Sequence, residues 1–235
     1  PVLNAMFETI AGASPYKSPT DMGVNMAGFC VTDDEAVREA AKMEILRRYY
    51  KVRRDYRLGQ VGEEAVRKVE SVMTQAGVEI SMRRVAAPAL EKAAETGEPA
   101  GAIELPDGTI VTGKTTALLG ACSAMLINAL KRLGGINQDI HLISPNFIEP
   151  IQRLKTGYLG NKNPRLHTDE VLMALTISAA TNPAAELALK QLGRLRGCEA
   201  HSSVLLSQVD DNVFRNLGVN LTCEPDYQTK QLFHK

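Results

Sequence analysis

The sequence predicts an α/β protein, with a helical N-terminal part followed by a three-layer α/β/α part that holds a mixed sheet. In the first hundred residues, apolar side chains recur mostly at helical spacing. After Gly101, short β-branched runs alternate with amphipathic segments. A turn at residues 106–108 joins the first two of these runs directly, whereas helices separate the later ones, so one sheet should contain both antiparallel and parallel pairs.

The N-terminal part is expected to contain four helices. The first, over residues 2–11, precedes a loop in which two prolines and two glycines prevent a continuous helix. A capping-box pattern at residues 32–35 begins a helix that runs to about Leu58. Two amphipathic helices follow over residues 62–75 and 85–95, and a glycine ends each of them.

The C-terminal part is expected to alternate strands and helices. Each expected strand is a short β-branched or apolar run, and each helix has a cap or an apolar stripe. The strands are expected over residues 102–105, 109–112, 140–143, 202–207 and 219–223, and the helices over 116–133, 147–155 and 209–217, with two more that begin near Thr168 and Asn182.

An antiparallel hairpin that leads into parallel strands is the arrangement of the cytidine-deaminase-like fold. The order of elements from residue 85 onward agrees with that topology. We therefore expect three segments. Residues 1–32 are a helix and loop, residues 33–84 are helical, and residues 85–235 form a deaminase-like α/β/α subdomain.

Composition excludes several classes of protein. The 235 residues include 44% hydrophobic and 23% charged side chains, values typical of a globular protein. The 27 basic residues equal the 27 acidic ones, so we expect no nucleic-acid partner. No apolar run is long enough to cross a membrane, and we expect no membrane association. The four cysteines are far apart without a C-x-x-C pair, which favours the reducing cytoplasm.

Residues 108–115 match the phosphate-loop pattern G-x-x-x-x-G-K-[ST]. Their context argues against a true phosphate loop. The first glycine closes the expected hairpin turn, and the β-branched residues that follow are typical of a pleated strand. We therefore interpret this segment as a turn and a strand.

An anion site is expected at paired helix starts. In a deaminase-like fold, the helices that follow the second and third strands begin at one pocket. The polar side chains at these two starts are Lys114, Thr115 and Thr116 for one helix, and Ser144 and Asn146 for the other. Helix N-termini with hydroxyls and a lysine suit a phosphate or carboxylate, although the same residues also suit ordinary helix caps. Deaminases hold zinc there through H-x-E and P-C-x-x-C motifs, and both are absent from this chain, so no metal is expected.

A polar loop enters the helix that begins near Thr168. It carries Arg165, His167 and Asp169, which are candidates for charge stabilisation and proton transfer. Plain N-terminal capping also explains these residues. Cys198 and His201 form a lone C-x-x-H, a weak pattern for a metal site.

Four segments, at residues 15–28, 103–114, 161–170 and 219–225, resemble a bacterial family of unknown function. Some longer members of this family carry the label ATP-dependent zinc protease, but the H-E-x-x-H motif is absent here. The resemblance implies that this chain is a C-terminal half. It also implies an N-terminal half outside the chain, with an α/β domain on which residues 1–32 are expected to pack and with its own glycine-rich segment. It supplies no reaction and no cofactor.

Our first functional hypothesis is part of an enzyme that acts on a phosphorylated or nucleotide-like small molecule. Polar side chains of the first loop are expected to reach the site: Lys17, Thr20, Asp21 and Asn25. The alternative is a non-catalytic binding or oligomerisation module, and a homo-oligomer is expected in either case. A zinc-dependent hydrolase is the third possibility, and it would need Cys198, His201 and a further ligand.

Overall fold

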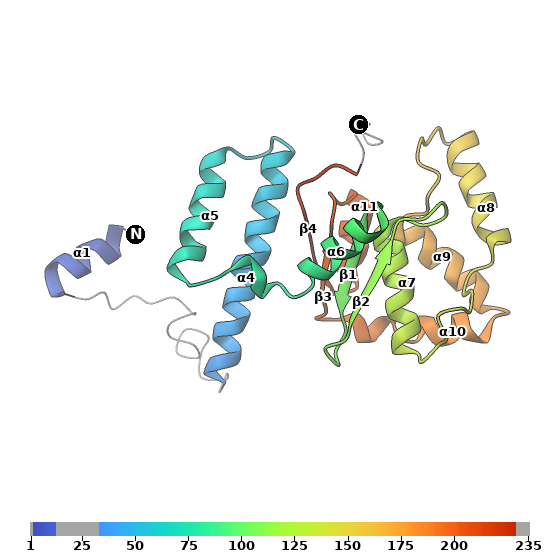
Figure 1. Ribbon diagram of the computed structural model, residues 1–235, viewed down its shortest axis with the longest axis horizontal. Coiled ribbons are helices and arrows are strands. Elements are labelled where there is room, and N and C mark those ends of the chain that lie inside the picture. The colour runs from blue at the N-terminus through green and yellow to red at the C-terminus, as the bar shows by residue number, and fades with distance from the viewer. Residues whose placement is uncertain (1, 13–32, 229–235) are drawn as a thin grey trace.

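A computed structural model describes residues 2–12 and 33–228 of the chain (Figure 1). Lys17, Thr20, Asp21 and Asn25 lie outside the described residues. The α-helices are α1 (Val2–Ala11), α4 (Asp34–Arg57), α5 (Glu63–Gln75), α6 (Ala86–Thr96), α7 (Ala121–Leu133), α8 (Pro145–Arg153), α9 (Thr168–Ala179), α10 (Pro183–Leu189) and α11 (Gln208–Asn216). The strands are β1 (Ala100–Glu104), β2 (Ile110–Lys114), β3 (Glu199–Ser202) and β4 (Asn220–Cys223). The predicted α/β class is confirmed.

Helices α4 and α5 form a helical hairpin with a core of its own. Helix α4 begins at Asp34 and is capped by the preceding residue, Asp33, whose side chain accepts a hydrogen bond from the Ala36 N–H at 2.9 Å. The residue that caps the helix is therefore Asp33, one residue later than the capping-box pattern at residues 32–35 predicts. Apolar side chains from both helices meet between them, and the buried members are Leu46, Tyr49, Tyr50, Val69, Met73 and Val78.

The four strands form one mixed sheet in the order β2-β1-β3-β4. Strand β1 pairs antiparallel with β2 and with β3, while β3 and β4 are parallel and α11 connects them. Helix α7 packs closely on β2, because a Cβ added at Gly113 would lie 2.1 Å from the Met125 backbone nitrogen. Residues 108–115 thus form a hairpin turn and a strand, as interpreted from the sequence.

The two faces of the sheet carry different neighbours (Figure 1). Because side chains alternate along a strand, His201 and Ala200 point to opposite faces. The His201 ring contacts Tyr50 of α4, with 4.8 Å between the ring centroids. Ala200 belongs instead to the main core, with side chains of α7 and α9. The sheet therefore separates the helical hairpin from the helices α7 to α10.

Two expected strands differ from the structure. Residues 140–143 are irregular, because the side chain of Asn182 donates hydrogen bonds to the carbonyls of His141 and Leu142, both at 3.3 Å. The strand expected over residues 202–207 is β3, which ends at Ser202. There the Ser202 hydroxyl bonds both the N–H and the carbonyl of Val204, and this turn ends the strand.

The deaminase-like topology is not confirmed. The strand expected between the hairpin and β3 is absent from the described residues, and the sheet they form has four strands. Among these residues, we find no helix with the length and apolar character required to span a membrane.

Candidate functional site

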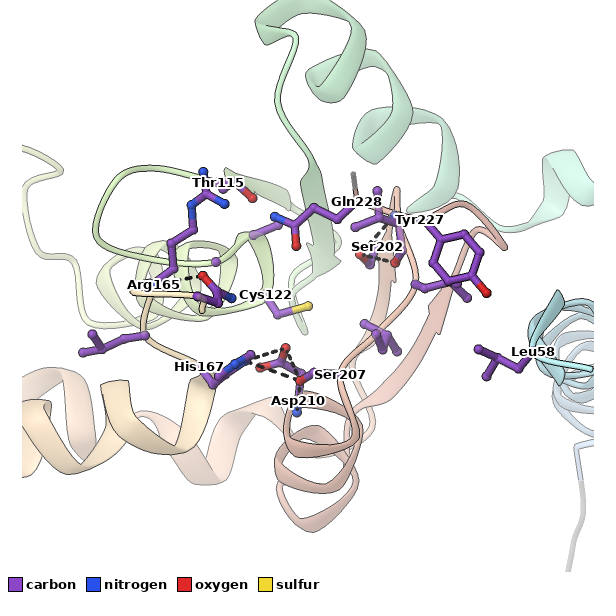
Figure 2. A pocket seen from close by; sticks show the side chains of 17 residues that line it. Leu58, Thr115, Cys122, Arg165, His167, Ser202, Ser207, Asp210, Tyr227 and Gln228 are labelled. Atoms are coloured by element: carbon purple, nitrogen blue, oxygen red, sulfur yellow. Dashed lines mark hydrogen bonds and ion pairs between the residues drawn. The ribbon is translucent and has the colours of Figure 1, made fainter. Parts of the chain in front are cut away.

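A cavity of about 180 Å³ lies at the C-terminal end of β3, where three helices begin (Figure 2). This volume is more than ten times the roughly 15 Å³ that one water molecule needs, so the cavity has room for a small molecule. We call it the His167 pocket. The polar side chains that line it include Thr115, Asn163, Arg165, His167, Ser207 and Asp210.

The starts of α7, α9 and α11 converge on the His167 pocket. The residue that precedes each helix lines the pocket: Gly120 for α7, His167 for α9 and Ser207 for α11. Gly120 has no side chain, so no side-chain hydrogen bond caps α7. Ala121 and Cys122, in the first turn of α7, also line the pocket. The first N–H groups and the positive end of the α7 dipole favour an anion at this point.

Asp210 holds the residues at the start of α9 and α11 together. One carboxylate oxygen accepts hydrogen bonds from the Thr168 N–H at 3.1 Å and the Thr168 hydroxyl at 2.8 Å. The other accepts the Ser207 hydroxyl at 2.8 Å and lies 3.6 Å from His167 Nδ1. Burial raises the pKa of Asp210, but hydrogen bonds from His167, Ser207 and Thr168 outweigh it and lower the pKa overall. Asp210 is therefore a carboxylate at neutral pH.

His167 stands at the pocket with its Nδ1 directed toward Asp210 and Ser207, the latter 3.5 Å away (Figure 2). In a nucleophilic Ser–His–Asp triad, the serine and the aspartate contact different ring nitrogens. Here both lie near the same nitrogen. The geometry favours a histidine that is oriented by a carboxylate for acid–base work, and it does not favour activation of Ser207 as a nucleophile.

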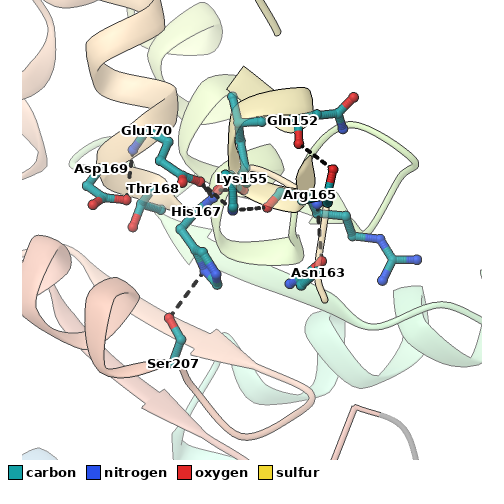
Figure 3. A network of polar contacts seen from close by, with 12 residues as sticks. Gln152, Lys155, Asn163, Arg165, His167, Thr168, Asp169, Glu170 and Ser207 are labelled. Carbon is teal, nitrogen blue, oxygen red and sulfur yellow. Dashed lines mark hydrogen bonds and ion pairs between the residues drawn. The ribbon is translucent and has the colours of Figure 1, made fainter. Parts of the chain in front are cut away.

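Lys155 and Glu170 hold the loop that carries Arg165 and His167 in place (Figure 3). The buried Lys155 ammonium donates to the Arg165 carbonyl and to Glu170 Oε2, both at 2.7 Å. The same Glu170 oxygen accepts the His167 N–H at 2.8 Å. These bonds fix the backbone of the loop and thus the direction in which both side chains leave it.

Arg165 and Thr115 lie together on one side of the pocket. Arg165 Nε donates to the carbonyl of Thr116, the residue next to Thr115, at 2.9 Å. Among the described residues, no carboxylate pairs with Arg165. The side chain of Thr115 is 2% exposed, and its hydroxyl has no hydrogen-bond partner in the part of the chain that the structure describes. A buried hydroxyl without a partner is costly unless a ligand supplies one.

Cys122 is not a thiolate nucleophile at neutral pH. The side chain is buried, and burial raises the pKa of its thiol well above the ordinary value. The negative charge of Asp210 raises it further. Since the thiolate is the reactive form, the thiol of Cys122 is expected to be inert.

The structure brings together three of the candidate residues, Thr115, Arg165 and His167, at the His167 pocket. The other described candidates lie elsewhere. Helix α7 begins at Ala121, so Lys114 is still in β2 and exposed. Thr116 contributes its carbonyl to Arg165, and its hydroxyl caps the N–H groups of residues 118 and 119.

Three further candidates act in helix capping. Ser144 caps α8, and its hydroxyl accepts the Asn146 N–H at 3.3 Å. The Asp169 carboxylate accepts the N–H of Glu170 at 2.7 Å. None of these three side chains lines the His167 pocket.

Sequence reasoning missed Ser207 and Asp210. They follow the pattern [ST]-x-x-[DE] that begins a helix, and in the structure the Asp210 N–H donates to the Ser207 hydroxyl at 3.1 Å. Because the sequence predicts a strand up to residue 207, it does not indicate that Ser207 caps the next helix. Nothing local in the sequence indicates that Asp210 contacts Thr168, 42 residues away.

The described residues contain no group of three or more His, Cys, Asp or Glu that could hold a metal ion. Cys198 lines a different cavity, near Arg84 and Arg196, and the buried His201 ring packs on Tyr50. These positions do not support the zinc-hydrolase hypothesis.

Comparison with known proteins identifies the family. The family model described as domain of unknown function DUF1846, N-terminal, matches residues 1–77, and the C-terminal DUF1846 model matches residues 81–233. The chain belongs to the DUF1846 family. It is 54% identical over 235 residues to a UPF0371 protein of Corynebacterium urealyticum, covering all of this chain and 47% of that protein. UPF0371 proteins of Corynebacterium efficiens and Streptococcus pneumoniae are 55% and 52% identical, and each match covers all of this chain and 48% of the relative.

The resemblance noted in the sequence is thus confirmed as membership of a family without an assigned function. The expectation that the N-terminal part of DUF1846 lies outside this chain is wrong, because the N-terminal model matches residues 1–77. The chain spans about half the length of the curated relatives that it matches.

Proposed function

We propose that this DUF1846 protein is part of a cytoplasmic enzyme that binds a phosphorylated small molecule in the His167 pocket. The observation that carries the proposal is the meeting of three anion-binding features in one cavity. These are the uncapped start of α7, the Arg165 side chain without a carboxylate partner among the described residues, and the buried Thr115 hydroxyl. Each suits phosphate oxygens, because each offers a donor and two offer positive charge.

His167 is the proposed acid–base residue. A proton-transfer group must stand within hydrogen-bond reach of the bound ligand, and His167 lines the same cavity as the anion-binding groups. Asp210, as a carboxylate 3.6 Å from Nδ1, orients the imidazole ring. The pair can therefore donate a proton to a leaving group or accept one from the substrate.

Two features support the proposed location in the cytoplasm and the division into segments that the sequence predicts. The described cysteines, Cys122, Cys198 and Cys223, are all free thiols, as expected in a reducing compartment. The hairpin α4–α5 has its own core, so we propose residues 33–84 as one segment and residues 85–235 as another.

A binding or oligomerisation module remains the second candidate, because exposed apolar side chains gather on and after α8. Tyr158 is 82% exposed and Leu159 is 66% exposed. Light scattering separates the candidates: a stable oligomer that Tyr158→Ser dissociates, together with no ligand binding, favours the module.

A thermal-shift titration tests the first candidate. Inorganic phosphate and a panel of phosphorylated metabolites are titrated into the wild-type protein, Arg165→Ala and Lys162→Ala. A ligand at about a hundred times its dissociation constant adds about 2.7 kcal/mol of stability. We expect a shift that Arg165→Ala removes and that Lys162→Ala, an exposed residue outside the pocket, retains. A folded wild-type protein that no phosphorylated compound stabilises would contradict the proposal.

A further inference from the structure

We infer that the ligand carries a flat aromatic ring near its phosphate, and that a wall of Leu58, Leu205 and Tyr227 receives the face of this ring. The inference deepens the proposed function and rests on it, because it assigns the second half of the same pocket. The chemical class that combines both features is a nucleoside monophosphate or an aromatic phosphate of similar length.

The His167 pocket has two chemically different ends. Arg165 and Thr115 lie on one side, whereas Leu58 and Tyr227 lie on the opposite side (Figure 2). Between Ser202 and Ser207, the wall is formed by the apolar residues 204–206. A pocket of this kind binds a ligand through a few polar groups that orient it and an apolar surface that covers its body.

The apolar wall is assembled from three distant parts of the chain. Leu58 follows the last turn of α4, and Arg57 beside it places its guanidinium 5.0 Å from the centroid of the Tyr227 ring. The Leu205 N–H donates to the carbonyl of Asp226 at 2.8 Å, which ties the segment before Tyr227 to residues 204–206. The C-terminal end of helix α4 therefore contributes to a pocket whose other lining residues lie between Thr115 and Gln228.

The exposure of these side chains also needs a reason. Leu58 is 45% exposed and Tyr227 is 39% exposed. Both residues line the pocket, so their exposed apolar surface is available to a ligand. Exposed apolar side chains at the mouth of a polar pocket are typical of a ligand site. A ring that stacks on Tyr227 buries this surface, and aromatic stacking accepts any flat ring, so the wall does not distinguish one base from another.

Calorimetric titration of four probes tests the inference. Inorganic phosphate and ribose 5-phosphate carry no flat ring, whereas phenyl phosphate and adenosine 5′-monophosphate do. We expect the two ring-bearing probes to bind about tenfold tighter than the two others, the size of effect that stacking of one base produces. Tyr227→Ala should remove this difference and leave the affinity for inorganic phosphate unchanged, while Tyr227→Phe should keep it.

Tyr56→Ala is the matched control, because Tyr56 is an exposed tyrosine of α4 that does not line the pocket, and its loss should change nothing. Equal affinity for all four probes, with Arg165→Ala weakening each of them, would overturn the ring inference and leave the phosphate site standing. A preference for ring-bearing probes that persists in Tyr227→Ala would also overturn it. Failure of every probe to bind the folded wild-type protein would overturn the proposed function itself.

Discussion

Two polar clusters of this protein, one on the α4 face of the sheet and one at the C-terminal end of β3, use similar residues in different ways. The Arg83 cluster, formed by Arg83, Glu199, His201 and Thr222, faces α4. The Arg83 guanidinium is fully buried and donates four hydrogen bonds, to the Glu199 and Thr222 side chains and to two strand carbonyls. In the His167 pocket, by contrast, Arg165 donates one side-chain hydrogen bond within the described part of the chain.

The difference separates a cluster that stabilises the fold from one that is available to a ligand. A buried polar network stabilises a structure only when its members have partners, since each unpaired group costs free energy. The Arg83 guanidinium has its partners within the protein. In the pocket, Arg165 has no carboxylate partner and the Thr115 hydroxyl has no hydrogen-bond partner among the described residues, so the further partners of both groups are expected in the ligand.

The largest expected effect comes from Arg83→Met, which removes the buried guanidinium that bonds the Glu199 carboxylate, the Thr222 hydroxyl and two strand carbonyls. Breaking a buried ion pair in this way lowers the free energy of unfolding by about 3–5 kcal/mol. Urea unfolding measures the loss. The adjacent Arg84 provides the control: its exposed ion pair with Glu104 is worth less than about 1 kcal/mol, so Arg84→Met should change little. Equal losses in both variants would contradict the structural role of Arg83.

A paired substitution of two buried threonines compares the clusters directly. The Thr222 hydroxyl bonds Arg83 Nε at 2.7 Å and His201 Nδ1 at 2.8 Å, so Thr222→Val should cost about 2 kcal/mol. The Thr115 hydroxyl has no partner in the described residues, so Thr115→Val should raise the stability by about 1 kcal/mol and weaken phosphate binding. Chemical denaturation and phosphate titration of both variants check this. A loss of stability in Thr115→Val similar to that in Thr222→Val would remove the distinction.

The sequence predicts the elements better than it predicts the clusters. The hairpin of β1 and β2 follows from a Pro-Asp-Gly turn between β-branched runs, and α10 follows from Asn182 before a proline; both depend on neighbours in the chain. Arg165 and His167 stand out for the same reason, because a polar loop before a helix is visible locally.

The contacts that make the clusters depend on the tertiary fold. Arg83 bonds Thr222 across 139 residues, and an arginine in a segment between two helices is ordinarily a surface residue. The expected anion site was displaced because α7 begins seven residues after Lys114, and no residue in between marks the start of that helix. Which helix starts meet at one pocket is decided by packing on the sheet and not by the caps themselves.

The smallest expected effect is a dependence of stability on pH that arises from His201. Its ring is buried against Tyr50 and lies near Glu224, Arg83 and Thr222. Burial lowers the pKa of His201, Glu224 opposes this effect and Arg83 adds to it, so the folded protein holds the ring neutral to a lower pH than the unfolded chain does.

Below about pH 6.5 the unfolded chain therefore binds a proton at this histidine that the folded protein does not bind, and stability falls as the pH drops from 7 toward 5. His201→Phe keeps an aromatic ring beside Tyr50 and removes the titrating group, so its stability should fall less steeply over this range. Denaturation at several pH values measures both slopes. The lowered pKa of Asp210 affects stability only near and below pH 4, where that carboxylate takes up a proton, so it does not disturb the comparison. Parallel slopes in the two proteins would show that the pKa of His201 is the same in the folded protein and in the unfolded chain, which contradicts the burial of its ring in the Arg83 cluster.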